Sequence, residues 1–187
     1  MARTPSNMLA LGTLAPDFYL PDTNSNHWKS FSDIKGSKGT VVFFICNHCP
    51  YVLHIVDEMV RIVNDYRVQG IGFVAISSND IEAYPQDAPD KMTEFAFENK
   101  FDFPYLYDEL QDTAQNYDAA CTPDIYLFDR ENKLIYRGQL DDSRPQNGIP
   151  TNGNDLRNAI DALLYNRSVN PLQKPSLGCN IKWKKAR

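Results

Sequence analysis

A strand–helix–strand unit in the first half of the chain is the sequence feature that most limits the folds available to the chain. Residues 41–45 form a continuous apolar and β-prone run, VVFFI, which is typical of a strand covered on both faces. From Val52, apolar residues recur at helical spacing until Gly70, and a second apolar run follows at residues 71–76. This order predicts a right-handed crossover between two parallel strands.

The second half of the chain adds elements in a different order. Three short elements are expected after a proline-containing loop: a helix over residues 91–99, a strand over 105–107 and a helix over 111–117. Residues 125–128 and 134–137 are β-prone runs joined by a short polar segment, which predicts an antiparallel hairpin. Residues 154–165 predict a last amphipathic helix. A βαβ half followed by a ββα half predicts an α/β sandwich with a mixed sheet.

Length, composition and charge limit the classes of protein to which this chain can belong. The 187 residues, of which 42% are hydrophobic, predict a single domain over residues 1–187. We expect its core over about residues 12–165 and a tail over residues 166–187. A net charge of -5 disfavours nucleic acid and anionic membranes as partners. No apolar run suits a secretory signal or a membrane span, so we expect a cytoplasmic protein.

The chemistry indicated by the sequence centres on a C-x-x-C motif, Cys46 and Cys49, at the junction between the first strand and the helix. Asn47 is a suitable N-cap and Pro50 is tolerated in a first turn, so we expect the helix to begin just after Cys46 and to leave its sulfur exposed. The helix dipole and His48 would stabilise a thiolate there. Cys46 is therefore the predicted nucleophile and Cys49 the resolving thiol. The alternative is a pair of buried structural cysteines.

These motifs resemble the thioredoxin superfamily. The resemblance rests on residues 41–50, VVFFICNHCP, and on residues 121–129, CTPDIYLFD. Residues 15–22, APDFYLPD, are similar to the start of its redoxin branch, which includes the peroxiredoxins of the alkyl hydroperoxide reductase/thiol-specific antioxidant family and the membrane-anchored thiol-disulfide reductases. The resemblance covers about residues 12–165 and implies a thioredoxin-like three-layer sandwich with a mixed central sheet and an N-terminal extended extension.

The resemblance also implies a substrate-binding loop at Thr122 and Pro123. In the superfamily the peptide bond before this proline is cis, and the loop lies against the C-x-x-C. A cis proline turns the backbone of the preceding residue outward, where it can pair with an incoming peptide strand. Thr122 and Pro123 are accordingly the expected substrate-binding residues.

Two departures from the family patterns bear on the function. Peroxiredoxins carry P-x-x-x-(S/T)-x-x-C, but counted back from Cys46 these positions are Gly39 and Phe43, so the hydroxyl that would help to bind a peroxide is missing. Many thioredoxins bury an acidic residue beneath the second cysteine, and residues 41–45 offer none. His54 is a candidate proton acceptor, with a solvated helix histidine as the alternative.

Three classes of function are compatible with the sequence. The first is a thiol-disulfide oxidoreductase that exchanges protein or small-molecule disulfides through Cys46 and Cys49, with thioredoxin or glutathione as reductant and no cofactor. The second is a thiol peroxidase that reduces hydroperoxides through Cys46, assisted by Arg137. The third is a metal-binding module, because Cys46, His48 and Cys49 are soft or borderline ligands. No histidine follows His54, which argues against copper, and no metal is expected.

The two remaining cysteines are candidate redox partners. Cys121 precedes the Thr122–Pro123 loop, and Cys179 lies in an apolar part of the tail, after Gly178. Cys179 is either a buried small residue that anchors the tail or a third redox partner that reaches the site beside Cys121. We expect the tail to pack back on the domain and Cys179 to be dispensable for basic disulfide exchange.

Overall fold

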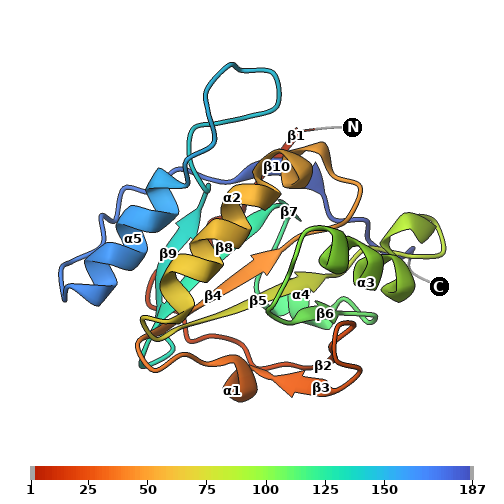
Figure 1. The fold of residues 1–187 in the computed structure, drawn as a ribbon, viewed down its shortest axis with the longest axis horizontal. Helices are drawn as coiled ribbons and strands as arrows, with labels where there is room; N and C mark the ends of the chain where they lie inside the picture. Colours follow the sequence, from red (N-terminus) through yellow and green to blue (C-terminus); the bar gives the residue numbers. More distant parts are fainter. Residues whose placement is uncertain (1–2, 186–187) are drawn as a thin grey trace.

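A five-stranded mixed sheet forms the centre of the computed structural model, which describes residues 3–185 (Figure 1). Its strand order is β6-β5-β4-β8-β9. The strands are β4 (Gly39–Phe44), β5 (Ile71–Ser77), β6 (Tyr105–Tyr107), β8 (Asp124–Asp129) and β9 (Leu134–Gly138). β4, β5 and β6 are parallel, whereas β8 is antiparallel to both β4 and β9. The predicted crossover and hairpin are therefore confirmed.

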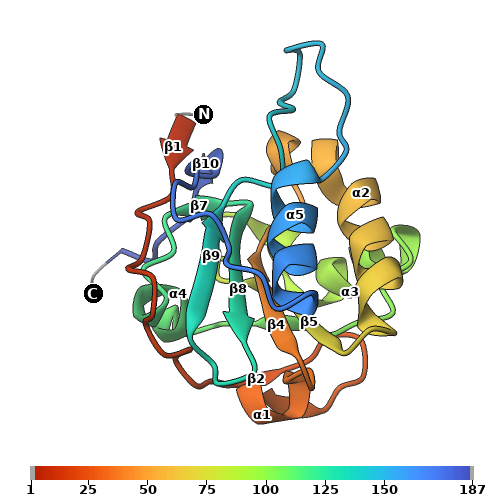
Figure 2. The same ribbon diagram turned by 90° about the vertical axis from the view of Figure 1, so that its left-hand side faces the viewer.

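Helices cover both faces of this sheet and so bury the apolar run of β4 on both sides. Successive strand residues point to opposite faces, so Val41 and Phe43 join one apolar cluster, whereas Val42 and Phe44 join the other. The first cluster is covered by α2 (Pro50–Arg67), α3 (Pro89–Glu98) and α5 (Asn154–Leu164), and the second by α1 (Phe31–Ile34) and α4 (Asp112–Asn116). Figure 2 shows the sheet between α2 and α5 on one side and α4 on the other. The three-layer sandwich is confirmed.

The chain before β4 contains short extended pieces, as expected, and one short helix, α1. β2 (Tyr19–Pro21) pairs with β3 (Trp28–Ser30), and α1 follows directly. Gly70 ends the helical segment after α2 with a φ of 95°, a conformation that favours glycine. Within residues 3–185, no helix is both long enough and apolar enough to cross a bilayer.

A second, three-stranded sheet was not predicted from the sequence. It has the order β1-β10-β7, with β1 (Arg3–Pro5), β10 (Leu177–Asn180) and β7 (Cys121–Thr122). β10 is antiparallel to both neighbours and places Cys179 opposite Thr122. The expectation that the tail packs back on the domain is thus confirmed, and β10 brings the tail to the end of β7 (Figure 1).

Candidate active site

The C-x-x-C motif lies between the end of β4 and the start of α2, but the helix begins later than predicted. Its first residue is Pro50 and its N-cap is Cys49, so the expected start directly after Cys46 is wrong. Proline has no N–H and suits the first position of a helix, where no intrahelical partner is needed. Asn47 is not the cap because its side chain is used elsewhere: its Nδ2 donates to Gln86 O at 3.0 Å, and its Oδ1 accepts from Tyr105 Oη at 2.9 Å.

Both cysteines of the motif are buried. Cys46 is 1% exposed and Cys49 is 0% exposed, so the predicted exposure of the Cys46 sulfur is wrong. Each of the two thiols shifts the pKa of the other. Burial of a thiol disfavours its charged form unless neighbouring donors compensate. The surroundings of each sulfur therefore decide which of them ionises.

Those surroundings favour a thiolate on Cys49. Hydrogen bonds from the thiols of Cys46 and Cys179 lower the pKa of Cys49 against the opposing effect of burial, and the N–H of Val52 at the start of α2 acts in the same direction. The pKa of Cys46 is raised by its hydrogen bond to Cys49, by burial and by the nearby carboxylate of Asp87. These contacts act in opposite directions on the two thiols and favour ionisation at Cys49, the N-cap of α2.

The Thr122–Pro123 loop lies against both cysteines. Its peptide bond is cis, as the family resemblance implied. Thr122 O is 3.1 Å from the Sγ of Cys49 and accepts a hydrogen bond from the neutral thiol, and Thr122 Oγ1 is 3.4 Å from the Sγ of Cys46. The backbone edge of Thr122 is not open to a substrate strand, however, because Cys179 of β10 pairs with it. The prediction that the Thr122 backbone is free to pair with an incoming peptide strand is therefore wrong for this conformation.

A buried carboxylate, Asp87, faces the motif from η1 (Pro85–Asp87) and was missed by the sequence analysis. It is 0% exposed. It accepts hydrogen bonds from the backbone N–H of Asn47 at 2.9 Å and from Nδ2 of Asn79 at 2.8 Å. Asp87 lies in a proline-containing loop, 40 residues after Asn47 in the sequence. Nothing in the neighbouring sequence distinguishes it from an aspartate in a surface turn.

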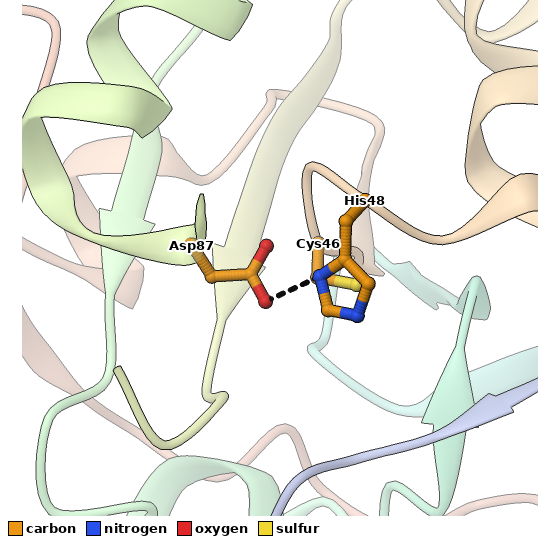
Figure 3. A group of neighbouring side chains, drawn as sticks. All are labelled: Cys46, His48 and Asp87. Atoms are coloured by element: carbon orange, nitrogen blue, oxygen red, sulfur yellow. Dashed lines mark ion pairs between the residues drawn. The ribbon is translucent and has the colours of Figure 1, made fainter. Parts of the chain in front are cut away.

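His48 is directed at Asp87 (Figure 3). Its Nδ1 lies 2.8 Å from Asp87 Oδ2, although without the alignment of a hydrogen bond, and its ring stacks on Tyr84 with 5.7 Å between centroids. Ligand atoms of Cys46, His48 and Asp87 all lie within 4.8 Å of one another. Sulfur, nitrogen and oxygen donors of this kind suit a borderline ion such as Zn²⁺. Each oxygen of the same carboxylate also accepts one hydrogen bond, from Asn47 N–H and from Asn79 Nδ2.

Of the two candidate redox partners, one joins the motif and one does not. The Sγ of Cys179 lies 3.0 Å from the Sγ of Cys49, whereas the Sγ of Cys121 faces Pro123 O at 3.5 Å. Burial raises the pKa of Cys121 well above its ordinary value. Cys46, Cys49 and Cys179 therefore form one cluster of thiols, from which the sulfur of Cys121 points away.

Two further candidates are held by other contacts. The Nε2 of His54 lies 3.2 Å from Thr151 Oγ1. The guanidinium of Arg137 donates to Leu9 O and to Gln173 Oε1, both at 2.8 Å. These contacts give each side chain a structural role that needs no thiol.

Comparisons with known proteins agree with this geometry. Residues 11–137 match the model of the AhpC/TSA family. Among solved structures, an uncharacterized conserved protein from Geobacillus kaustophilus is 53% identical, with a TM-score of 0.98 and coverage of 100% of this chain and 99% of that one. A hypothetical protein from Sinorhizobium meliloti is 44% identical, with a TM-score of 0.95 and coverage of 98% and 100%.

A more distant structure shares the fold. The thioredoxin domain of a thiol-disulfide oxidoreductase from Bacteroides vulgatus is 21% identical, with a TM-score of 0.59 and coverage of 69% of this chain and 88% of that one. No curated protein matches the sequence. The thioredoxin-like sandwich expected from the sequence is therefore confirmed.

Proposed function

Because this chain belongs to the AhpC/TSA family, in the redoxin branch of the thioredoxin superfamily, we propose that it is a thiol-disulfide oxidoreductase whose redox pair is Cys46 and Cys49. Family membership supports thiol-based redox chemistry in general. The observation that carries the finer proposal is the contact of both sulfurs with the Thr122 side of the cis proline loop, at the N-terminus of α2. In this arrangement the lowered pKa of Cys49 favours its thiolate, and Cys46 lies close enough to resolve a disulfide at Cys49.

The proposed reaction exchanges the roles predicted from the sequence. The thiolate of Cys49 attacks one sulfur of a substrate disulfide, the substrate S–S bond breaks, and one substrate thiolate leaves and takes up a proton. Cys46 then attacks Cys49 Sγ, which forms the Cys46–Cys49 disulfide and releases the second substrate thiol. Asp87, within 4.8 Å of the Cys46 sulfur, takes the Cys46 proton, and the substrate thiolate that leaves Cys49 takes up a proton from solvent. Two electrons pass to the substrate, and thioredoxin or glutathione restores the dithiol.

A thiol peroxidase is the second candidate, because the family includes peroxiredoxins and Cys49 has the lowered pKa that such enzymes need. The peroxiredoxin pattern is incomplete whichever cysteine is taken as the nucleophile. Counted back from Cys49, Val42 stands in place of proline and Cys46 in place of serine or threonine; counted from Cys46, these positions are Gly39 and Phe43. The hydroxyl is missing in both cases, which favours disulfide exchange.

Single-cysteine variants test the proposal. With a peptide disulfide as substrate and dithiothreitol as reductant, Cys49→Ser should lower kcat/KM by about 10³-fold or more. Cys46→Ser combined with Cys179→Ser, which removes both thiols that could resolve it, should accumulate a mixed disulfide at Cys49, which intact-protein mass spectrometry detects as the added mass of one substrate half. Cys121→Ser is the matched control and should retain activity. Full activity in Cys49→Ser, or hydrogen peroxide turnover faster than disulfide exchange, would contradict the proposal.

A further inference from the structure

We propose that Cys179 is a third redox-active thiol, and that it competes with Cys46 to form a disulfide with Cys49. The inference rests on the proposed function and concerns the same thiol cluster. Its first support is the distance of 3.0 Å between the Sγ atoms of Cys49 and Cys179. A disulfide bond measures about 2 Å, so a shift of about 1 Å joins the two sulfurs.

Strand pairing explains why the Cys179 sulfur is so close. β10 runs antiparallel to β7, and Cys179 is opposite Thr122, whose carbonyl oxygen contacts the Cys49 sulfur at 3.1 Å. Cys179 therefore occupies the place where an incoming peptide strand would pair with Thr122. In this structure the tail presents its own cysteine to Cys49 as a substrate strand would.

Gly178 makes this close approach sterically allowed. A Cβ atom built on Gly178 would lie 1.9 Å from Thr122 O and 2.6 Å from Thr122 C. Both of these are backbone atoms, which cannot move aside as the end of a flexible side chain can. The Gly178–Cys179 pair thus combines a residue that lets two backbones touch with a residue that carries the thiol.

The tail is anchored on both sides of Cys179. Before it, Ser176 Oγ donates to Pro123 O at 2.7 Å. After it, the N–H of Ile181 donates to Ala120 O at 3.1 Å, and the N–H of Lys182 donates to Asn79 Oδ1 at 2.8 Å. These bonds hold the thiol in one place, so its effective concentration at Cys49 is high.

The step balances with the reactants of the proposed function. After Cys49 has formed a mixed disulfide with the substrate, Cys179 attacks Cys49 Sγ. The Cys49–substrate bond breaks, the Cys49–Cys179 bond forms, and the Cys179 proton goes to the leaving substrate thiolate. Attack by Cys46 on Cys49 then exchanges this bond for the Cys46–Cys49 disulfide and returns Cys179 as a thiol. The exchange involves no net oxidation.

Disulfide mapping of the wild-type protein tests the inference directly. Trypsin separates the cysteines into residues 39–61 with Cys46 and Cys49, residues 101–130 with Cys121, and residues 168–182 with Cys179. The folded protein is treated with oxidised glutathione, quenched in acid, alkylated and digested without reduction. We expect links between 39–61 and 168–182 at about tenfold or more above any link to 101–130, which measures random scrambling. In Cys46→Ser this link should become the main product.

Gly178→Ala is a variant that keeps every thiol. It should lower the yield of the 39–61 to 168–182 link by about tenfold or more and leave the Cys46–Cys49 disulfide intact. Leu172→Ala, at a tail position that is 88% exposed, is the matched control and should not change the yield. Thermal unfolding of both variants establishes that they remain folded.

The outcomes separate the two proposals. An internal disulfide in 39–61, with 168–182 linked no more often than 101–130, would overturn the role of Cys179 and leave the proposed function standing. The absence of any disulfide at Cys49 would overturn both. An undiminished link in folded Gly178→Ala would show that β10 pairing does not present the thiol.

Discussion

Asp124 should make the stability of this protein fall as the pH rises, and Asp124→Asn should remove much of that dependence. The residue follows the cis proline, is 0% exposed and accepts a hydrogen bond from the Ala120 N–H at 3.2 Å. Burial raises the pKa of its carboxyl from 3.8 to about 7. At a pH between these two pKa values, the Asp124 carboxyl is protonated in the folded chain and ionised in the unfolded chain. Stability is therefore highest below the unfolded pKa and is lost as the pH rises through the folded pKa.

The size of the effect follows from the displacement of the pKa. One pKa unit corresponds to about 1.4 kcal/mol, so ionising this buried carboxyl costs the folded state about 4 kcal/mol in total. Of this, about 3 kcal/mol is lost between about pH 5 and about pH 8. The asparagine is uncharged at every pH, and its oxygen can still accept the Ala120 N–H.

Urea unfolding at about pH 5 and at about pH 8, in the presence of a reductant, measures this loss of stability. The free energy of unfolding of Asp124→Asn, relative to wild type, should rise by about 3 kcal/mol from the lower to the higher pH. Asp57→Asn, on the exposed side of α2, is the control and should show no such rise. If the wild type and Asp124→Asn lose stability in parallel, the carboxyl is not protonated in the folded protein and the reasoning fails.

Three further substitutions test single contacts. Asp87→Asn removes the charge that raises the pKa of Cys46, so this pKa should fall; alkylation rates of Cys46 over a pH series measure it, and an unchanged profile would contradict the assignment. Tyr105→Phe removes the donor to Asn47 Oδ1 and should lower the free energy of unfolding by about 1 kcal/mol in a urea titration, whereas no loss would mean that water replaces the phenol. Met59→Ala leaves a cavity under α2, where Met59 is 0% exposed, and should cost about 2–5 kcal/mol in the same titration; a smaller cost would indicate collapse of the cavity.

The sequence predicts the central sandwich well because its elements carry strong local patterns. The apolar run of β4 and the helical period of α2 each extend over enough residues to exclude the other type of element. α1 was not predicted, although its start has a local signal: Ser30 and Asp33 form a capping box. At four residues, that helix is too short to show a period. β7 and β10 are shorter than any reliable strand pattern, and their pairing depends on how the rest of the chain packs.

The site was only partly predictable, for a different reason. The C-x-x-C and the Thr122–Pro123 loop are local motifs, and both were found. The start of α2 was placed at Asn47 because local rules favour asparagine as a cap, but Tyr105 and Gln86 bind that side chain. The tertiary fold brings Asp87 and Cys179 to the motif from distant segments. No rule of spacing links such residues to the motif in advance.

The charges that this site can carry explain why its cysteines are not equivalent. Three thiols and the carboxylate of Asp87 share a region from which water is largely excluded, and like charges close together in such a region oppose each other. The Asp87 side chain disfavours a charge on the neighbouring Cys46, whereas a charge on Cys49 is stabilised by two thiol donors. We therefore propose that the cluster ionises once, at Cys49. In the proposed reaction, Cys46 and Cys179 act after Cys49 has formed the mixed disulfide, so they compete with each other as resolving thiols and do not compete with Cys49 for the substrate.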